Sequence, residues 1–311
     1  MEHYSVLLKE AIEGLNIRLD GIYVDGTLGR GGHSSEILKR LTTGHLYSFD
    51  IDDEAFAYSE KRLSEISDSF TLIKANFADM KSELNQRNMT GVDGILLDIG
   101  VSSPQFDEDY RGFSYRYEDS RLDMRMDRNQ SLDAYKVVNE YEYGDLVRIF
   151  YRYGEESYAK QIARKIETER AKAPIETTGQ LVEIIRSALP RKVVNKHKHP
   201  AKKVFQAIRI EVNNELENLS EGLKNALDLL NPCGRLAVIS FHSLEDQIIK
   251  STFKNASQPP HIDKRIPLKQ DEIREAEFTL ITRKPITAGE RELNENRRSH
   301  SAKLRIIEKR G

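Results

Sequence analysis

The stretch DGTLGRGGHS, residues 25–34, follows the short apolar run GIYV and precedes a segment with the apolar spacing of a helix. Its four glycines therefore stand between a predicted strand and a predicted helix. A glycine-rich turn in this position lets backbone N–H groups come close to a ligand at the start of the helix. A tight strand-to-helix turn that binds nothing is the alternative interpretation of the same residues.

Residues 21–100 continue the order of strand and helix that this turn begins. Strands are expected at 22–25, 45–50, 70–74 and 94–98, and helices between them, for example at 34–41 and 54–66. This alternation is typical of a parallel sheet with right-handed crossover connections.

From about residue 106 to residue 200 the strand pattern stops. Helices are expected there at 131–139, 143–151, 155–170 and 178–189. A long helical run at 201–230 then leads into strands expected at 235–240, 278–283 and 303–308. The sequence thus predicts an α/β fold with a sheet domain built from 1–105 and 201–311, and an all-helical domain, 106–200, inserted into it.

Acidic residues end three of the predicted neighbouring strands, and they indicate the kind of ligand. Glycines at 26–32 follow the pattern GxxGxGG, which does not match the GxGxxG of dinucleotide-binding folds. Asp25 suits a ligand with a cationic amino group, such as S-adenosylmethionine. Asp50 lies about twenty residues after the turn, where an acid that binds ribose hydroxyls usually stands. Asp98 is expected to face the ligand crevice, or to cap a turn.

Composition excludes several classes of protein. The 311 residues include 48 Lys and Arg against 50 Asp and Glu, and the net charge is −2. This charge is not that of a strongly basic nucleic-acid binder, so an argument for RNA rests on local patches, such as the six Lys and Arg at 191–203. No apolar run is long enough for a membrane span or a signal peptide. With Cys233 as the lone cysteine and a mean hydropathy of −0.60, we expect a soluble, cytoplasmic protein.

Six stretches resemble one family, the bacterial 16S rRNA cytosine-N4 methyltransferases of the RsmH (MraW) type. They are HYSVLLKEAI at 3–12, GIYVDGTLGRGGHS at 21–34, DGILLDIGVSSPQFD at 93–107, RGFSYRYEDSRLDMRMD at 111–127, HPAKKVFQAIRIEVNNEL at 199–216 and GRLAVISFHSLEDQIIK at 234–250. The resemblance implies a class I, Rossmann-like methyltransferase sheet whose last strand is antiparallel, and an inserted helical domain that recognises the substrate. It also implies a specific reaction: methyl transfer from S-adenosylmethionine to the N4 amine of a cytidine in the decoding region of 16S rRNA, in the small ribosomal subunit.

The same resemblance implies a set of cofactor contacts. They are Gly31, Gly32, His33, Asp50, Phe77, Asp98 and Gln105. Phe77 on its own would more often be an ordinary core aromatic residue. Many amino-methyltransferases end the fourth strand with Asp/Asn-Pro-Pro-aromatic, whereas this chain, like the family, has Asp98-Ile99-Gly100-Val101. Our hypothesis is that Asp98 is catalytic, and that it holds the amine, orients the cofactor, or does both.

Other residues have two interpretations each. Asp123 and Asp127 stand one helical turn apart by spacing, and either shape the substrate pocket or belong to a salt-bridged surface with neighbouring arginines. His242 is either a general base or, more commonly for such a residue, a structural histidine. The face formed by Gln206, Arg209 and Asn213 meets either the target nucleotide or water. His197 and His199 lack ligand partners at the required spacing, so no metal site is expected.

Two other functions compete with this one. A nicotinamide-dependent oxidoreductase would need the missing GxGxxG pattern. A non-catalytic rRNA-binding assembly factor that kept the fold would be expected to have lost the glycine turn or Asp98. The sequence leaves the oligomeric state open, with a homodimer among the options, and does not specify whether naked RNA, an assembly intermediate or the whole subunit is the substrate.

Overall fold

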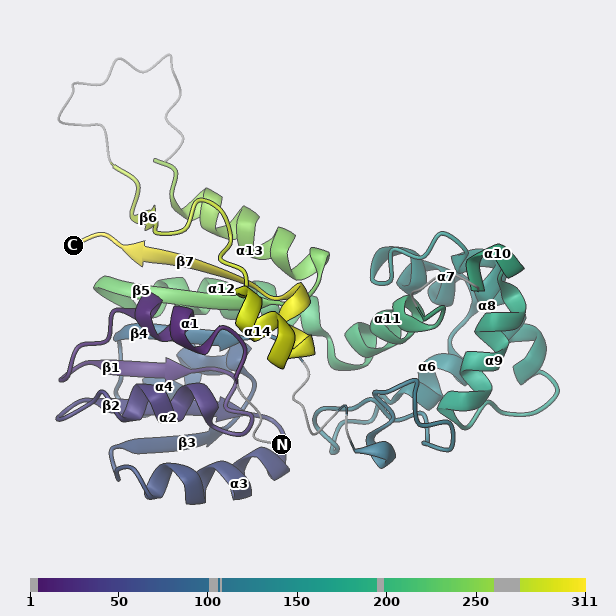
Figure 1. Cartoon of the computed structure of the whole chain (residues 1–311), viewed down its shortest axis with the longest axis horizontal. Coiled ribbons are helices and arrows are strands. Elements are labelled where there is room, and N and C mark those ends of the chain that lie inside the picture. Colours follow the sequence, from purple (N-terminus) through teal and green to yellow (C-terminus); the bar gives the residue numbers. More distant parts are fainter. Residues whose placement is uncertain (1–4, 101–105, 107, 195–198, 260–274) are drawn as a thin grey trace, which may run out of the picture. The chain divides into compact units, whose positions relative to one another are not determined.

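Figure 1 shows the computed structural model of the chain, which describes residues 5–100, 106, 108–194, 199–259 and 275–311. The chain forms two compact units. The sheet unit consists of Met1–Gly100 and Leu216–Gly311, and the helical unit consists of Val101–Glu215. Each unit has its own buried apolar core, so each is described by itself below.

The sheet unit is built on one sheet. In the described part of the chain its strands are β1 (Ile22–Asp25), β2 (His45–Asp50), β3 (Phe70–Lys74), β4 (Val92–Asp98), β5 (Leu230–Ser240), β6 (Phe278–Leu280) and β7 (Lys303–Lys309). Their order is β3-β2-β1-β4-β5-β7-β6, and β7 runs antiparallel to both neighbours while the other pairs are parallel. The expected Rossmann-like sheet with an antiparallel last strand is therefore confirmed. The strand order has its topological switch point between β1 and β4. In open α/β sheets, ligands bind at the carboxyl ends of the strands at such a point.

Helices cover both faces of this sheet. The apolar cluster on one face includes residues of α1 (Leu8–Leu15), α2 (Gly32–Leu38) and α3 (Asp53–Ser64), and the opposite cluster includes α4 (Met80–Gln86), α12 (Glu215–Leu229) and α13 (Ser243–Ala256). Figure 1 shows α1 and α2 in front of the strands. A short helix, α14 (Glu290–Glu295), precedes β7. None of the helices within the described residues combines the length and the apolar character that a membrane span requires.

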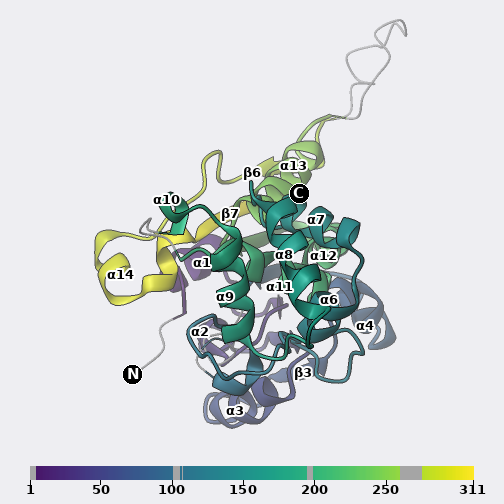
Figure 2. The ribbon, with the colours of Figure 1, turned by 90° about the vertical axis from the view of Figure 1, so that its right-hand side faces the viewer.

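The helical unit contains no sheet strand among its described residues. Its helices are α6 (Ala134–Glu140), α7 (Tyr143–Arg152), α8 (Ala159–Arg170), α9 (Thr178–Ala188), α10 (Arg191–Val194) and α11 (Lys202–Asn213). Figure 2 shows α6, α7, α8, α9 and α11 grouped together. Buried apolar side chains from these five helices, among them Val137, Ile149 and Leu181, form a single core. A capping box between Thr177 and Gln180 starts α9, so its first backbone N–H groups are satisfied.

Two expectations about the return to the sheet are wrong. The run at 201–230 is not one helix, because Asn214 adopts the left-handed conformation (φ +50°) and separates α11 from α12. Asparagine tolerates this conformation better than most residues do. α11 also does not belong to the sheet unit: Val204, Phe205 and Ile208 are buried in the core of the helical unit. The helical unit therefore ends at Glu215, and not at residue 200.

Candidate active site

The acids that end β1, β2 and β4 lie at the same edge of the sheet, because these strands are parallel. Asp25 is only 1% exposed. The hydroxyl of Ser34 donates to Asp25 Oδ2 at 2.7 Å, and the N–H of Thr27 donates to Oδ1 at 3.1 Å. Asp25 thus ties the glycine-rich turn to α2. The contact of Asp25 with a cationic ligand group stays a prediction.

The glycine-rich turn is held by Asp50. Gly31 takes the N-cap position of α2 with φ +69°, a conformation that a side chain would strain. The N–H of Gly29 donates to Asp50 Oδ2 at 2.8 Å, and the N–H groups of Ile51 and Asp52 donate to Oδ1 at 2.8 and 2.9 Å. Burial raises the pKa of Asp50 to about 6, although these N–H groups act in the opposite direction. The end of β2 and the turn after β1 are therefore one connected unit.

Asp98 has the least satisfied carboxylate of the three. Its backbone N–H donates to Thr27 Oγ1 at 2.7 Å, and its Oδ2 lies 3.7 Å from Nδ1 of the buried His33. His33 Nε2 lies 3.1 Å from the carbonyl oxygen of Val6, which can only accept, so Nε2 carries a proton. Asp98 Oδ1 is buried and has no hydrogen-bond partner among the described residues. Burial raises the pKa of Asp98 to about 6, with the charge of His33 opposing and that of Asp25 adding to the shift.

The other expected cofactor contacts that the structure describes, Gly32 and Phe77, also lie at or beside this turn. Gly32 is the first residue of α2, and Phe77 begins a short 3₁₀ helix after β3. A Cβ placed on Gly26 would lie 3.0 Å from Phe77 Cβ, so the Phe77 side chain starts beside the turn. A Cβ on Gly222 of α12 would lie 2.5 Å from the Phe77 ring, so that glycine leaves room for the ring. Gln105 lies outside the described residues.

His242 follows β5 and caps a helix. It is the N-cap of α13, where its side chain accepts from the N–H of Glu245. Glu245 Oε2 in turn accepts from the N–H groups of Phe241 and His242 at 2.8 and 3.2 Å. Sequence reasoning did not predict the capping contact of Glu245, which is 1% exposed, or the contact of Thr27 with Asp98. The three-residue spacing of a capping box would have identified Glu245, whereas no sequence signal marks Thr27 as the acceptor for Asp98.

Comparisons with known proteins identify the family. The sequence profile of the MraW methylase family matches residues 1–310. The chain belongs to the MraW methylase family. A protein of Exiguobacterium sibiricum named ribosomal RNA small subunit methyltransferase H is 58% identical over 308 residues, which are 99% of this chain and 98% of that protein. A protein of the same name from Lactiplantibacillus plantarum is 54% identical over 311 residues, covering 99% of this chain and 97% of that protein.

A solved structure shows a weaker likeness. The crystal structure of an rRNA methylase from Streptococcus thermophilus aligns over 98% of this chain and 94% of its own, with 13% identity and a TM-score of 0.41. The family assignment itself rests on the sequence match, which extends over both units. This MraW-family chain is therefore a methyltransferase.

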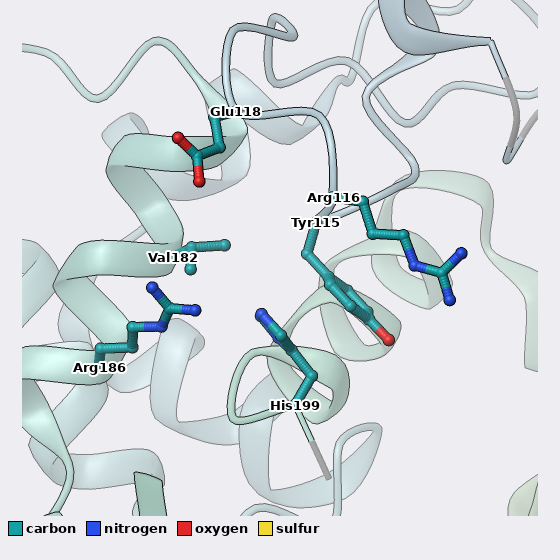
Figure 3. Close-up of a pocket in the computed structure, with 6 residues that line it drawn as sticks. All are labelled: Tyr115, Arg116, Glu118, Val182, Arg186 and His199. Atoms are coloured by element: carbon teal, nitrogen blue, oxygen red, sulfur yellow. The ribbon is translucent and has the colours of Figure 1, made fainter. Parts of the chain in front are cut away.

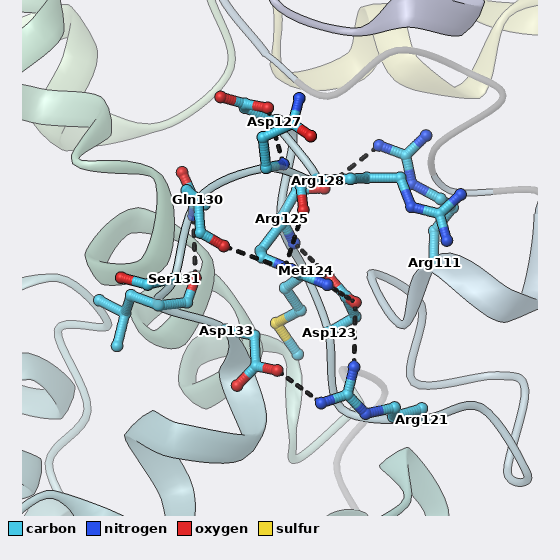
Figure 4. A network of polar contacts seen from close by, with 12 residues as sticks. Arg111, Arg121, Asp123, Met124, Arg125, Asp127, Arg128, Gln130, Ser131 and Asp133 are labelled. Carbon is cyan, nitrogen blue, oxygen red and sulfur yellow. Dashed lines mark hydrogen bonds and ion pairs between the residues drawn. The ribbon is translucent and has the colours of Figure 1, made fainter.

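In the helical unit of this MraW-family chain, Asp123 is an ion-paired residue (Figure 4). Arg125 donates to both of its oxygens at 2.8 Å, and Arg121 Nη1 lies 3.4 Å from Oδ2. Although burial acts to raise it, the Arg125 hydrogen bonds and charge hold the pKa of Asp123 below its usual value. The salt-bridged interpretation is confirmed for Asp123. The helical spacing with Asp127 is wrong, because this segment is a loop in which Met124 has φ +59°.

The polar residues of α11 form hydrogen bonds within the helical unit. Arg209 donates twice to the Glu215 carboxylate at 2.8 Å. Gln206 donates to the carbonyl of Tyr153, and Asn213 bonds the backbone of Met124 and Met126. These three side chains hold the helical unit together. Of the basic stretch at 191–203, Asn195–Lys198 lie outside the described residues, and α10 is without a buried residue.

Proposed function

We propose that this MraW-family chain transfers a methyl group from S-adenosylmethionine to the N4 amine of a cytidine in the decoding region of 16S rRNA. The observation that carries the proposal is Asp98 Oδ1, a buried carboxylate oxygen without a partner among the described residues, at the end of β4 beside the glycine turn. The relatives named ribosomal RNA small subunit methyltransferase H support the class of substrate. The partner is then the small ribosomal subunit, and the compartment the cytoplasm.

The charges at the strand ends fit this cofactor. Within the described residues, no Lys or Arg forms an ion pair with Asp25, Asp50 or Asp98. When bound, S-adenosylmethionine supplies a methyl group activated by a sulfonium, and it carries an ammonium group as well. Carboxylates without an ion-paired Lys or Arg favour such a cation and disfavour the anionic pyrophosphate of a nicotinamide dinucleotide. The same observation argues against the oxidoreductase alternative.

The residues around the turn have separate tasks in this proposal. Gly31, Gly32 and His33 form the turn against which the cofactor packs. Asp50 accepts from ribose hydroxyls with the lone pairs that its three N–H donors leave. Phe77, which lies beside the turn, covers the adenine.

Asp98 acts on the nucleophile. The N4 amine of cytosine is a weak nucleophile because its lone pair is delocalised into the ring, so alignment with the methyl group is the main requirement. A hydrogen bond from the amine to Asp98 Oδ1 would fix the nitrogen. As the N–C bond forms and the C–S bond breaks, the nitrogen loses one proton, which Asp98 accepts. His33, beside Oδ2 at 3.7 Å, limits the cost of the buried charge.

The test is methyl transfer from labelled S-adenosylmethionine to small ribosomal subunits from cells that lack this protein, followed by nucleoside analysis. We expect N4-methylcytidine at one position, and no incorporation into subunits from cells that contain the protein. Label elsewhere, or none on subunits, assembly particles and naked 16S rRNA despite cofactor binding, would contradict the proposal. The second of these results would favour the non-catalytic assembly factor.

A further inference from the structure

The helical unit contains a pocket that the proposed reaction does not use. Its volume is about 460 Å³, within the range of small-molecule sites. Its lining comes from the loop before α6, from α9 and from the segment before α11, namely Tyr115, Arg116, Glu118, Val182, Arg186 and His199. Figure 3 shows Val182 and Arg186 on one side of the space and the Tyr115 and His199 rings on the other.

One wall of this pocket is a fixed aromatic pair. The Tyr115 and His199 rings stack with centroids 4.1 Å apart and planes 13° apart. The ring of Phe205 meets Tyr115 edge-on at 5.8 Å, and His199 Nδ1 accepts from the N–H of Ala201. Burial and the charges of Arg186 and Arg116 lower the pKa of His199, which favours the neutral imidazole. The pair is therefore an uncharged, pre-oriented surface on which a flat ligand group can stack.

Two cations stand beside this aromatic pair. Arg186 extends from α9 into the space between Val182 and His199, and Arg116 lies next to Tyr115 (Figure 3). Arg186 donates to Glu183 at 2.7 Å, but this pair is exposed and such pairs contribute little. Glu118 is the one carboxylate in the lining. A flat platform beside guanidinium groups is the arrangement by which proteins bind unpaired nucleotides, with the base stacked and the phosphate on arginine.

We propose that this pocket binds one unpaired nucleotide of the RNA substrate, with its base on the His199 ring and its phosphate at Arg186. The identity of that RNA rests on the proposed function, whereas the preference for an unpaired nucleotide rests on the pocket alone. Val182 closes the site on the side opposite His199.

The first experiment measures the affinity of the full chain for a fluorescein-labelled single-stranded oligocytidylate by anisotropy. Loss of one base stack predicts that His199→Ala weakens binding about 5- to 150-fold. His199→Phe keeps a ring at this position and should restore most of the affinity. Because His199 is half-buried, thermal melting of each variant checks that the unit still folds.

The second experiment separates the phosphate contact from the stack. Arg186→Ala should weaken binding and reduce the slope of log affinity against log salt by about 0.7, the value for one phosphate contact on a single strand. His199→Ala should leave that slope unchanged. Arg152→Ala, which removes an exposed arginine of α7 in the same unit, is the matched control and should behave like the parent chain. Arg186 is exposed, so this variant tests the pocket even if His199→Ala does not fold.

The outcomes distinguish this proposal from the proposed function. If His199→Ala and Arg186→Ala bind the RNA as Arg152→Ala does, the pocket proposal is wrong, whatever the methyl-transfer assay shows. If these variants lose RNA affinity while the parent chain methylates no RNA, the pocket proposal stands and the proposed function fails. Unchanged RNA affinity with weakened binding to intact small subunits would assign the pocket to a ribosomal protein, and would also overturn the proposal.

Discussion

The acids that end three strands of the sheet unit and Asp123 of the helical unit have different partners. In the sheet unit, Asp25 and Asp50 accept from hydroxyl and backbone N–H groups, and Asp98 Oδ1 has no partner among the described residues. In the helical unit, Asp123 is paired with Arg125 and Arg121, and Asp133 with Arg121. Burial does not explain the difference, because Asp25 is 1% exposed and Asp123 is 9% exposed.

The difference lies in whether an arginine forms an ion pair with the carboxylate. Burial raises the pKa of Asp50 and Asp98 to about 6, although the charges of His33 and Arg298 oppose the shift at Asp98, whereas the hydrogen bonds and charge of Arg125 outweigh burial and lower the pKa of Asp123. A carboxylate that is already ion-paired with arginine stabilises the fold, and few of its lone pairs remain free to bind a ligand. An unmatched one costs stability, and that cost is recovered when a cation or an N–H donor binds. The comparison therefore assigns chemistry to the ends of the strands and structural support to the arginine network.

Asp98→Asn should have the largest effect. The amide keeps the size of the carboxyl group but cannot take up the proton from the amine, so we expect kcat for methyl transfer to fall about 10²- to 10³-fold. Normal affinity for S-adenosylmethionine, measured by calorimetry, would assign Asp98 to the amine, and lost affinity would assign it to the cofactor. Asp79→Asn, at an exposed acid of the same unit, is the control. Full activity of Asp98→Asn would show that Asp98 is not catalytic, and would remove the functional distinction between Asp98 and the ion-paired Asp123.

Asp25→Ala tests the structural member of the strand-end acids. The change leaves the hydroxyl of Ser34 and the N–H of Thr27 without their acceptor in a buried site. We expect the free energy of unfolding to fall by about 2–4 kcal/mol, measured by urea denaturation. Asp20→Ala removes an exposed carboxylate nearby and should change stability by less than about 1 kcal/mol. If Asp25→Ala kept full stability but lost only cofactor affinity, Asp25 would be a ligand contact after all.

Arg125→Met tests the matched carboxylate. Arg125 and Asp123 side chains are 18% and 13% exposed, so the removal of one partner leaves a charge with little water. We expect a loss of about 1–3 kcal/mol in unfolding free energy. Asp123→Asn in the same background should recover part of it, which a double-mutant cycle measures. Arg152→Met is the exposed control, and additive single effects would show that the pair is not coupled.

Much of the fold was predictable because the sheet follows from local patterns. Short apolar runs that end in Asp25, Asp50 and Asp98 mark the parallel strands, and a turn rich in glycine marks the switch from strand to helix. The boundary of the helical unit was not predictable. A helical pattern continues on both sides of Asn214, and only tertiary packing shows that Val204 and Phe205 belong to the other core.

The site was predictable in part for a similar reason. Position at the end of a strand places Asp98 and Asp50 correctly, but it does not reveal which carboxylate the chain satisfies itself. That depends on Ser34, Thr27 and Gly29, whose donors are set by turn geometry. Likewise, the sequence does not show that Arg209 is paired. Its partner Glu215 follows Asn214, where α11 ends, and that break in the helix could not be predicted.

The smallest effect is on the pH dependence of stability, and its sign differs between the strand-end acids Asp50 and Asp98 and Asp123. The folded pKa of Asp98 and Asp50, about 6, lies above the usual 3.8, so the native state holds more protons between these values. Their contribution to stability is present below about pH 4 and is lost as pH rises to about 6. For Asp123, whose folded pKa lies below 3.8, the contribution is present above pH 4 and is lost as pH falls below it.

Urea denaturation of two variants across pH separates these terms. Asp98→Asn removes an unmatched carboxylate, so relative to the parent chain it should gain stability between pH 4 and 6 and remain more stable, by about 1–2 kcal/mol, at pH 7. Asp123→Asn should be less stable than the parent chain at pH 7, and its deficit should shrink as pH falls below about 4. The parent's kcat/KM should also fall below pH 6, because only the ionised Asp98 accepts from the amine. A gain in stability by Asp98→Asn at pH 7 would show that the charge of Asp98 destabilises the folded parent chain. If the stabilities of both variants instead shift in the same direction with pH, relative to the parent chain, Asp98 and Asp123 do not differ in the way proposed here.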